Sequence, residues 1–195
     1  MPTILQRGYT VTGLLVGLAA AGIALSIGVP SVAGFIANQA QVSATNELVN
    51  ALDLARDEAL RRSRYVTVCR STNGEQCNAS GNDWKAGWIV FANDSMANIN
   101  SADANDEILR YFDRRGDKRR VLADRPNLTF VAFTPTGTVA APVTWTFCDS
   151  RGDDEARAIT LNRAGRARAS LPQAPNPPPG DYDGEVPGEN GAICS

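Results

Sequence analysis

The pattern of hydrophobic and polar residues changes three times along this 195-residue chain. Residues 8–46 contain no charged side chain, and 11–29 are almost wholly apolar. An uncharged run near the N-terminus, preceded by Arg7, predicts either a secretion signal or a membrane anchor. As a helix, residues 11–29 would be roughly 30 Å long, which is enough to cross a bilayer.

A removed signal and a retained anchor differ in where the apolar run ends relative to a cleavage site. Ala19-Ala20-Ala21 resembles the small-residue site at which a secretory signal is cut. The apolar run nevertheless continues to Val29. We therefore favour a retained anchor over a removed signal.

Beyond Pro30, apolar residues recur at the spacing of an α-helix as far as about Ser63. Charged side chains enter only from Glu47, so this second half is amphipathic. A helix from Tyr9 to Ser63 would be roughly 80 Å long, far more than a membrane needs. An apolar first half followed by an amphipathic second half suits a filament spine, because the first half can leave lipid and pack against neighbouring subunits.

From Arg64 the pattern changes to the alternation and β-branched composition of strands. Residues 93–107 and 113–125 are expected to be polar connections. One helix followed by six or seven short strands predicts an α+β fold, with the helix packed on an antiparallel sheet. The expected strands are 65–69, 87–91, 108–112, 128–133, 143–148, 158–161 and a short one near 167–171.

The four cysteines all lie beyond the apolar segment, and an even count in an exported chain predicts two disulfides. Three connectivities are possible. We favour Cys69–Cys77, which closes a tight loop around Asn73-Gly74, and Cys148–Cys194, which ties down the tail. A zinc site is disfavoured because the chain has no Cys-x-x-Cys pair.

Composition points away from an enzyme. The chain has no histidine, which excludes Ser-His-Asp and Cys-His nucleophilic sites. A net charge of −2 indicates no particular partner. Asp103, Asn105, Asp106 and Glu107 offer oxygen atoms, but their spacing lacks the glycine and distal glutamate of an EF-hand. No cofactor and no metal are therefore expected.

The N-terminal residues Gly8-Tyr9-Thr10-Val11-Thr12-Gly13-Leu14 resemble the class III signal of type IV pilins and type II secretion pseudopilins. That resemblance implies cleavage after Gly8 by a prepilin peptidase and N-methylation of Tyr9. Pro30 stands where the family commonly has a proline in its filament-core helix. Gly13 departs from the family, which usually has a glutamate there to neutralise the amine of a neighbouring subunit.

Motifs beyond the helix are similar, in order, to the GspH/FimT family of minor pilins, over residues 8 to about 170. The resemblance implies a structural subunit of a type IV pilus or a type II secretion pseudopilus. The missing carboxylate at Gly13 suggests a subunit near the filament tip or one incorporated sparsely, where the lost pairing can be tolerated. The motifs that carry it are 55–69, Trp84-Lys85-Ala86-Gly87-Trp88-Ile89-Val90-Phe91, Phe133-Thr134-Pro135-Thr136-Gly137 and 158–168.

Arg163, Arg166 and Arg168 surround Gly165, and on a strand Arg166 and Arg168 would project to one face. Such a pair of guanidinium groups suits phosphate oxygens. In the FimT-type branch of the resembled family, this motif is associated with DNA uptake. We favour the alternative, in which these arginines are solvated or pair with nearby acids. Those acids are Asp149, Asp153, Asp154 and Glu155.

A second basic run is interleaved with acids, which largely cancels its field and favours a solvated loop. Its members are Arg110, Arg114, Arg115, Lys118, Arg119, Arg120 and Arg125, with Asp113, Asp117 and Asp124 between them.

The expected protein is a single-pass inner-membrane subunit with a periplasmic head, whose partners are other pilin subunits, the prepilin peptidase and, in the alternative, DNA. Its expected segments are a leader at 1–8, a transmembrane or filament-core helix at 9–30, an amphipathic continuation at 31–63, a β-rich head at 64–171 and a Pro- and Gly-rich tail at 172–195.

Overall fold

The computed structural model describes residues 10–78, 80–93, 98–103, 106–152, 155–170 and 194. The expected leader, with its junction at Gly8 and Tyr9, and nearly all of the expected tail lie outside these residues. The chain forms two compact units, Met1–Ala40 and Gln41–Ser195.

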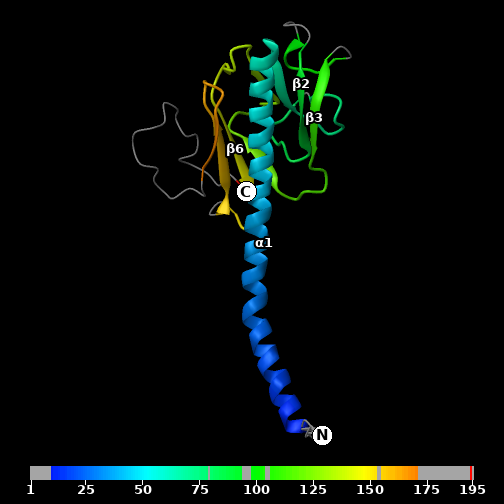
Figure 1. Ribbon diagram of the computed structural model, residues 1–195, viewed down its shortest axis with the longest axis vertical. Coiled ribbons are helices and arrows are strands. Elements are labelled where there is room, and N and C mark those ends of the chain that lie inside the picture. Colours follow the sequence, from blue (N-terminus) through cyan, green and yellow to red (C-terminus); the bar gives the residue numbers. More distant parts are fainter. Residues whose placement is uncertain are drawn as a thin grey trace, which may run out of the picture. The chain divides into compact units, whose positions relative to one another are not determined.

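Helix α1 (Val11–Arg62) is continuous through Pro30, which confirms the long helix expected from the sequence (Figure 1). Thr10 caps its start, because the backbone N–H of Gly13 donates to Thr10 Oγ1 at 3.3 Å. At its end Ser63 adopts a left-handed φ of 52°, and the N–H of Arg64 donates to the carbonyl of Ala59 at 3.3 Å. This is a Schellman ending, and it turns the chain out of the helix without a glycine.

Eight described strands form two four-stranded antiparallel sheets in the second unit, with the orders β3-β2-β1-β5 and β4-β6-β7-β8. The α+β class is thus confirmed, and the strands divide between two sheets where the sequence suggested one. The strands are β1 (Val66–Arg70), β2 (Gly87–Ala92), β3 (Glu107–Asp113), β4 (Arg120–Ala123), β5 (Phe130–Phe133), β6 (Val143–Cys148), β7 (Arg157–Leu161) and β8 (Ala167–Ser170).

Strand β4 corrects the sequence analysis, which placed residues 113–125 in a polar connection. Val121 and Ala123 are buried while their neighbours are more exposed, and β4 pairs with β6 along its whole length. The strand is short and charged residues flank it, so its two inward positions were too few to stand out from the surrounding polar pattern.

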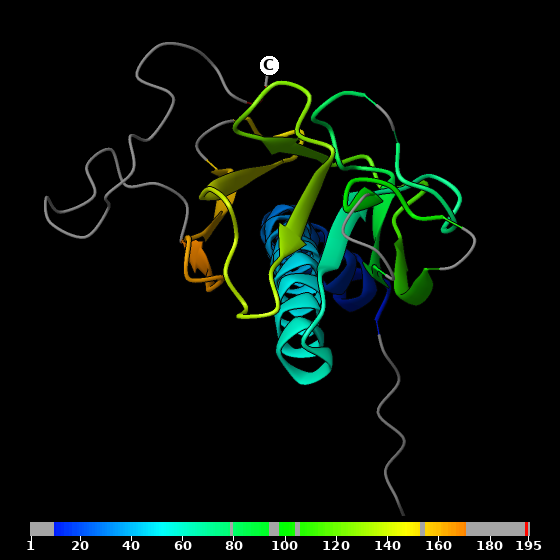
Figure 2. The ribbon, with the colours of Figure 1, turned by 90° about the horizontal axis from the view of Figure 1, so that it is seen from above.

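The core of the second unit lies between the C-terminal part of α1 and both sheets. Figure 2, which looks along the helix, shows strands of the two sheets around the cyan part of α1. The buried helix face is spaced as in an amphipathic helix and joins one hydrophobic cluster with residues of both sheets. Its members are Ala44, Leu48, Ala51, Leu52, Ala55 and Ala59.

All three tryptophans belong to this core. Trp84 and Trp145 meet edge to face, with ring centroids 5.5 Å apart. Trp84 also donates its indole N–H to the carbonyl of Leu128 at 2.9 Å, which satisfies its polar atom inside the core.

Candidate assembly surface

The first unit exposes an apolar helix surface. Exposure ranges from 77% at Val11 to 55% at Val32 among the large hydrophobic side chains of this part. Many exposed apolar side chains on one helix indicate contact with other proteins or with lipid. The exposed side chains are Val11, Leu14, Leu15, Val16, Leu18, Ile23, Val32, Phe35 and Ile36. Across the described residues, no helix combines the length and the hydropathy needed to span a bilayer.

Gly13 lies in the first turn of α1, and the structure leaves room for a side chain there. A Cβ at this position would lie 3.4 Å from Thr10 Oγ1, which is an ordinary van der Waals contact. Its backbone is helical, without the positive φ that favours glycine. Among the described residues of the subunit, nothing requires glycine at the position where the resembled family usually has glutamate.

Gln41 is a fully buried polar residue of α1 that fixes the helix against the second sheet. Its Nε2 donates to the carbonyl of Phe147 at 3.1 Å, and its Oε1 accepts from Arg151 at 3.2 Å. Arg151 also pairs with Asp149 and Glu155. Both ends of the Gln41 amide are satisfied, so the helix is held at one position along β6.

A short motif, Asp-x-Arg, occurs three times at turns of the second unit. In each copy the aspartate accepts the backbone N–H two residues later, as in an Asx turn, and pairs with the guanidinium of the same arginine. The pairs are Asp113 with Arg115, Asp117 with Arg119, and Asp149 with Arg151. The first two pairs lie in the second basic run, so acids interleaved in this run pair with its arginines.

Arg114 does not fit the solvated loop predicted for the second basic run, because it is only 5% exposed. Its guanidinium lies 5.4 Å from the ring centroid of Trp88 and 5.8 Å from that of Phe147, one ring from each sheet. It also pairs with Asp117. Burial raises the pKa of Asp117, but hydrogen bonds from Arg119 and the charge of Arg114 outweigh it and bring the pKa to about 2. The sequence offered no signal for this buried cation beyond its place in a charged run.

The end of α1 is tied to edge strand β3 by ion pairs. Arg62 contacts Glu58 one turn earlier at 2.6 Å and also Glu107 at the start of β3, and Arg61 pairs with Glu58 as well. The hydrogen bond from Arg62 lowers the pKa of Glu58, and the same arginine lowers the pKa of Glu107. The contacts place the last turn of the helix against the first sheet.

The three candidate DNA-binding arginines lie on the surface around the turn between β7 and β8. Arg163 and Arg166 belong to the turn, Arg168 lies in edge strand β8, and all three are exposed. Among the described residues no ion pair involves any of them.

Two of the predicted acidic partners are engaged elsewhere, since Asp149 and Glu155 pair with Arg151. The expected pairing with these two acids is therefore wrong. Asp153 and Asp154 lie outside the described residues. The solvated interpretation of the three arginines agrees with their exposure, and nothing found in the fold or among the relatives supports DNA binding.

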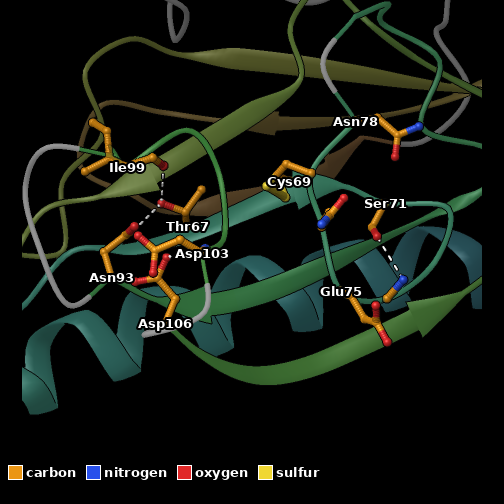
Figure 3. The surroundings of a disulfide bond; sticks show 12 residues. Thr67, Cys69, Ser71, Glu75, Asn78, Asn93, Ile99, Asp103 and Asp106 are labelled. Carbon is orange, nitrogen blue, oxygen red and sulfur yellow. Dashed lines mark hydrogen bonds between the residues drawn. A yellow bond between two sulfur atoms is a disulfide. The ribbon is translucent and has the colours of Figure 1, made fainter.

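Both favoured disulfides are present, between Cys69 and Cys77 and between Cys148 and Cys194. They close loops with sequence separations of 8 and 46 residues. In the smaller loop, Asn73 Oδ1 accepts the N–H groups of Glu75 and Gln76, which forms the predicted turn. Figure 3 labels Cys69, Ser71 and Glu75 of this loop. The second disulfide joins the end of β6 to residue 194.

Comparison with protein families gives a direct match. The family model for the "Type II transport protein GspH" matches residues 44–165. The chain belongs to the GspH family. The matched region begins in the buried part of α1 and ends at the turn before β8, so it includes the helix–sheet core and confirms the family resemblance predicted from the sequence motifs.

Solved structures of minor pilins resemble this GspH-family chain. The type IV minor pilin FimU of Pseudomonas aeruginosa is 22% identical over 70% of this chain and 92% of its own, with a TM-score of 0.53. A second crystal form of FimU gives 21% identity, coverage of 66% and 90%, and a TM-score of 0.50. The minor pseudopilin EpsH of Vibrio cholerae is 13% identical over 69% and 98%, with a TM-score of 0.45. The FimU comparison establishes a shared fold. A comparison with curated proteins found no match.

Proposed function

We propose that this GspH-family protein is a minor pilin or pseudopilin, a structural subunit that assembles into or primes a type IV pilus or a type II secretion pseudopilus. The observation that carries this function is the exposed apolar surface of α1 between Val11 and Ile36, on a helix that continues directly into the core of the head. Such a surface is costly in water and is stabilised when neighbouring helices cover it.

Before assembly, the subunit resides in the inner membrane with its head in the periplasm. The uncharged residues 8–46 after Arg7 support insertion of the N-terminal part. Two disulfides in the head support an oxidising compartment. Prepilin peptidase removes the leader after Gly8 and methylates the new N-terminal residue, Tyr9.

The subunit is placed at the filament tip or incorporated sparsely. An N-terminal ammonium in an apolar filament core is costly unless a carboxylate pairs with it. Gly13 cannot offer that carboxylate to a neighbour, although the helix has room for a side chain there. At the filament tip, or with sparse incorporation, few neighbouring subunits have an amine that is left without a carboxylate, so the loss is tolerated best there.

Site-specific photo-crosslinking in the native host tests assembly. A photoreactive residue replaces Leu18, which is 64% exposed, and a second variant carries it at Leu48, which is fully buried. We expect adducts between the Leu18 variant and other pilin subunits, identified by mass, and none from the Leu48 variant. The identity of the partner would also distinguish a pilus from a pseudopilus. Absence of any pilin adduct at Leu18, with the protein present in the membrane, would contradict the proposed function.

A further inference from the structure

Asn93, directly after β2, is a buried amide with one unsatisfied end. The side chain is only 3% exposed, and its Nδ2 donates to Thr67 Oγ1 at 2.8 Å. Among the residues that the structure describes, its Oδ1 has no hydrogen-bond partner. A buried acceptor without a donor is unfavourable, so this oxygen calls for an explanation.

The orientation of this amide is fixed by its neighbour. Thr67 donates its hydroxyl hydrogen to the carbonyl of Ile99 at 2.8 Å. A hydroxyl has a single hydrogen, so Thr67 Oγ1 can only accept from Asn93. Rotating the amide by 180° would bring two oxygens together without a hydrogen between them. The nitrogen of Asn93 therefore faces Thr67, and its oxygen faces away.

Two carboxylates lie in the segment that leads into β3. Asp106 Oδ2 accepts the backbone N–H of Asp103 at 3.0 Å, and the N–H of Asp106 donates to the carbonyl of Asp103 at 3.2 Å. Figure 3 shows the side chains of Asn93, Asp103 and Asp106 gathered together beside Thr67, apart from Cys69. The donor set is thus made of oxygen atoms alone, and it includes an amide oxygen that no hydrogen bond satisfies.

We propose that a calcium ion binds to Asn93 Oδ1 and to the carboxylates of Asp103 and Asp106. Calcium prefers carboxylate and amide oxygens and completes a coordination number of six to eight with waters and carbonyls. A positive ion also explains why a buried oxygen faces two acids. Magnesium suits the site less well, because it demands near-ideal octahedral geometry and holds its waters firmly.

This site was not expected from the sequence, because its donors come from two ends of a connection and do not follow a loop motif. Within the described residues, no group of three or more acidic, cysteine or histidine side chains is placed to hold a metal. The third donor is instead the neutral Asn93. Two carboxylates predict weak binding, with a dissociation constant of about 10⁻⁴ to 10⁻³ M, as in extracellular calcium modules. Bound calcium would connect the segment before β3 to β1 through Asn93 and Thr67.

Thermal unfolding of the full mature chain in detergent, stripped with EDTA and followed by tryptophan fluorescence, tests this site. At calcium concentrations about tenfold above the dissociation constant, the unfolding temperature should rise by roughly 3–6 °C. The double variant D103N/D106N should lose this rise. The matched variant D53N/D57N, which removes two exposed acids of α1, should keep it.

A third variant separates a metal ligand from a purely structural amide. N93D adds a carboxylate, so it should be less stable than the wild type in EDTA and should gain more than the wild type from calcium. Three results would overturn the proposal: no rise up to 10-millimolar calcium (roughly tenfold above the weak end of the range), a rise that survives in D103N/D106N, or an equal rise with magnesium. These results do not depend on filament assembly.

Discussion

Gly165, in the turn between β7 and β8, combines a left-handed backbone with a close approach to another turn. Its φ is 71°, and an added Cβ would lie 2.1 Å from the carbonyl oxygen of Gly137. That oxygen accepts a hydrogen bond from Arg56 Nε at 3.3 Å, so it cannot move away without loss. We predict that Gly165→Ala destabilises the head by about 1–2 kcal/mol for the left-handed backbone and by about 1–3 kcal/mol more for the displaced turn.

A matched control separates these two contributions. Gly116 has a φ of 92°, but nothing lies within 4 Å of its added Cβ, so Gly116→Ala should cost only the backbone part. The assay is urea unfolding of the full chain in detergent, followed by tryptophan fluorescence, because all three tryptophans lie in the second unit. A free energy of unfolding that falls equally in the two variants would refute the proposed contact between the turns.

Three further predictions concern the disulfides, the ion pairs and the stem. Removing the bridge at Cys148, which closes 46 residues, should cost about 4 kcal/mol in urea unfolding, and removing the bridge at Cys69, which closes 8, about 2.5 kcal/mol. Because the pKa of Asp117 is lowered to about 2 from an ordinary 3.8, its contribution is present above pH 3.8 and is lost as the pH falls through about 2. Between pH 3.8 and about pH 2, the urea midpoint of unfolding should therefore change less with pH in Arg119→Met than in the wild type. Gly13→Glu should increase the number of copies in sheared filaments, measured by immunoblot, and unchanged stoichiometry would remove the basis for the tip position.

Local pattern was sufficient for most of the fold. The period of apolar residues predicted α1 to within two residues at its start and one at its end, and runs such as 143–148 coincide with the observed β6. These elements carry their own signal, because each buries a face with a regular spacing. The two favoured disulfides rested on the tight loop between Cys69 and Cys77 and on the need to tie down the tail near Cys194, and both are present.

Contacts between residues far apart in the chain could not be predicted from local sequence patterns. The burial of Arg114 depends on Trp88 from one sheet and Phe147 from the other, and no local spacing reveals such a meeting. The pairing of Arg151 with Gln41 spans 110 residues. The Asp-x-Arg turns are different, because their spacing is visible in the sequence and the Asx turn gives it a physical reason.

The division of the strands into two sheets also depends on long-range pairing. Strand β4 pairs with β6 and not with β5, the next strand in sequence, and β5 pairs with β1. Strands β4 and β5 each present alternating burial, which is compatible with either sheet. The buried face of α1 accommodates both sheets, because its residues form one hydrophobic cluster with residues of each sheet.

Intact mass of the protein from its native membranes and sheared filaments, with and without reduction, tests most directly whether the chain is processed and assembled as a minor pilin or pseudopilin. We predict that both fractions contain a chain beginning at N-methylated Tyr9, which gains four hydrogen atoms on reduction, two for each disulfide. A chain that begins at Met1, or one cut after Ala21 and absent from filaments, would contradict the proposed function.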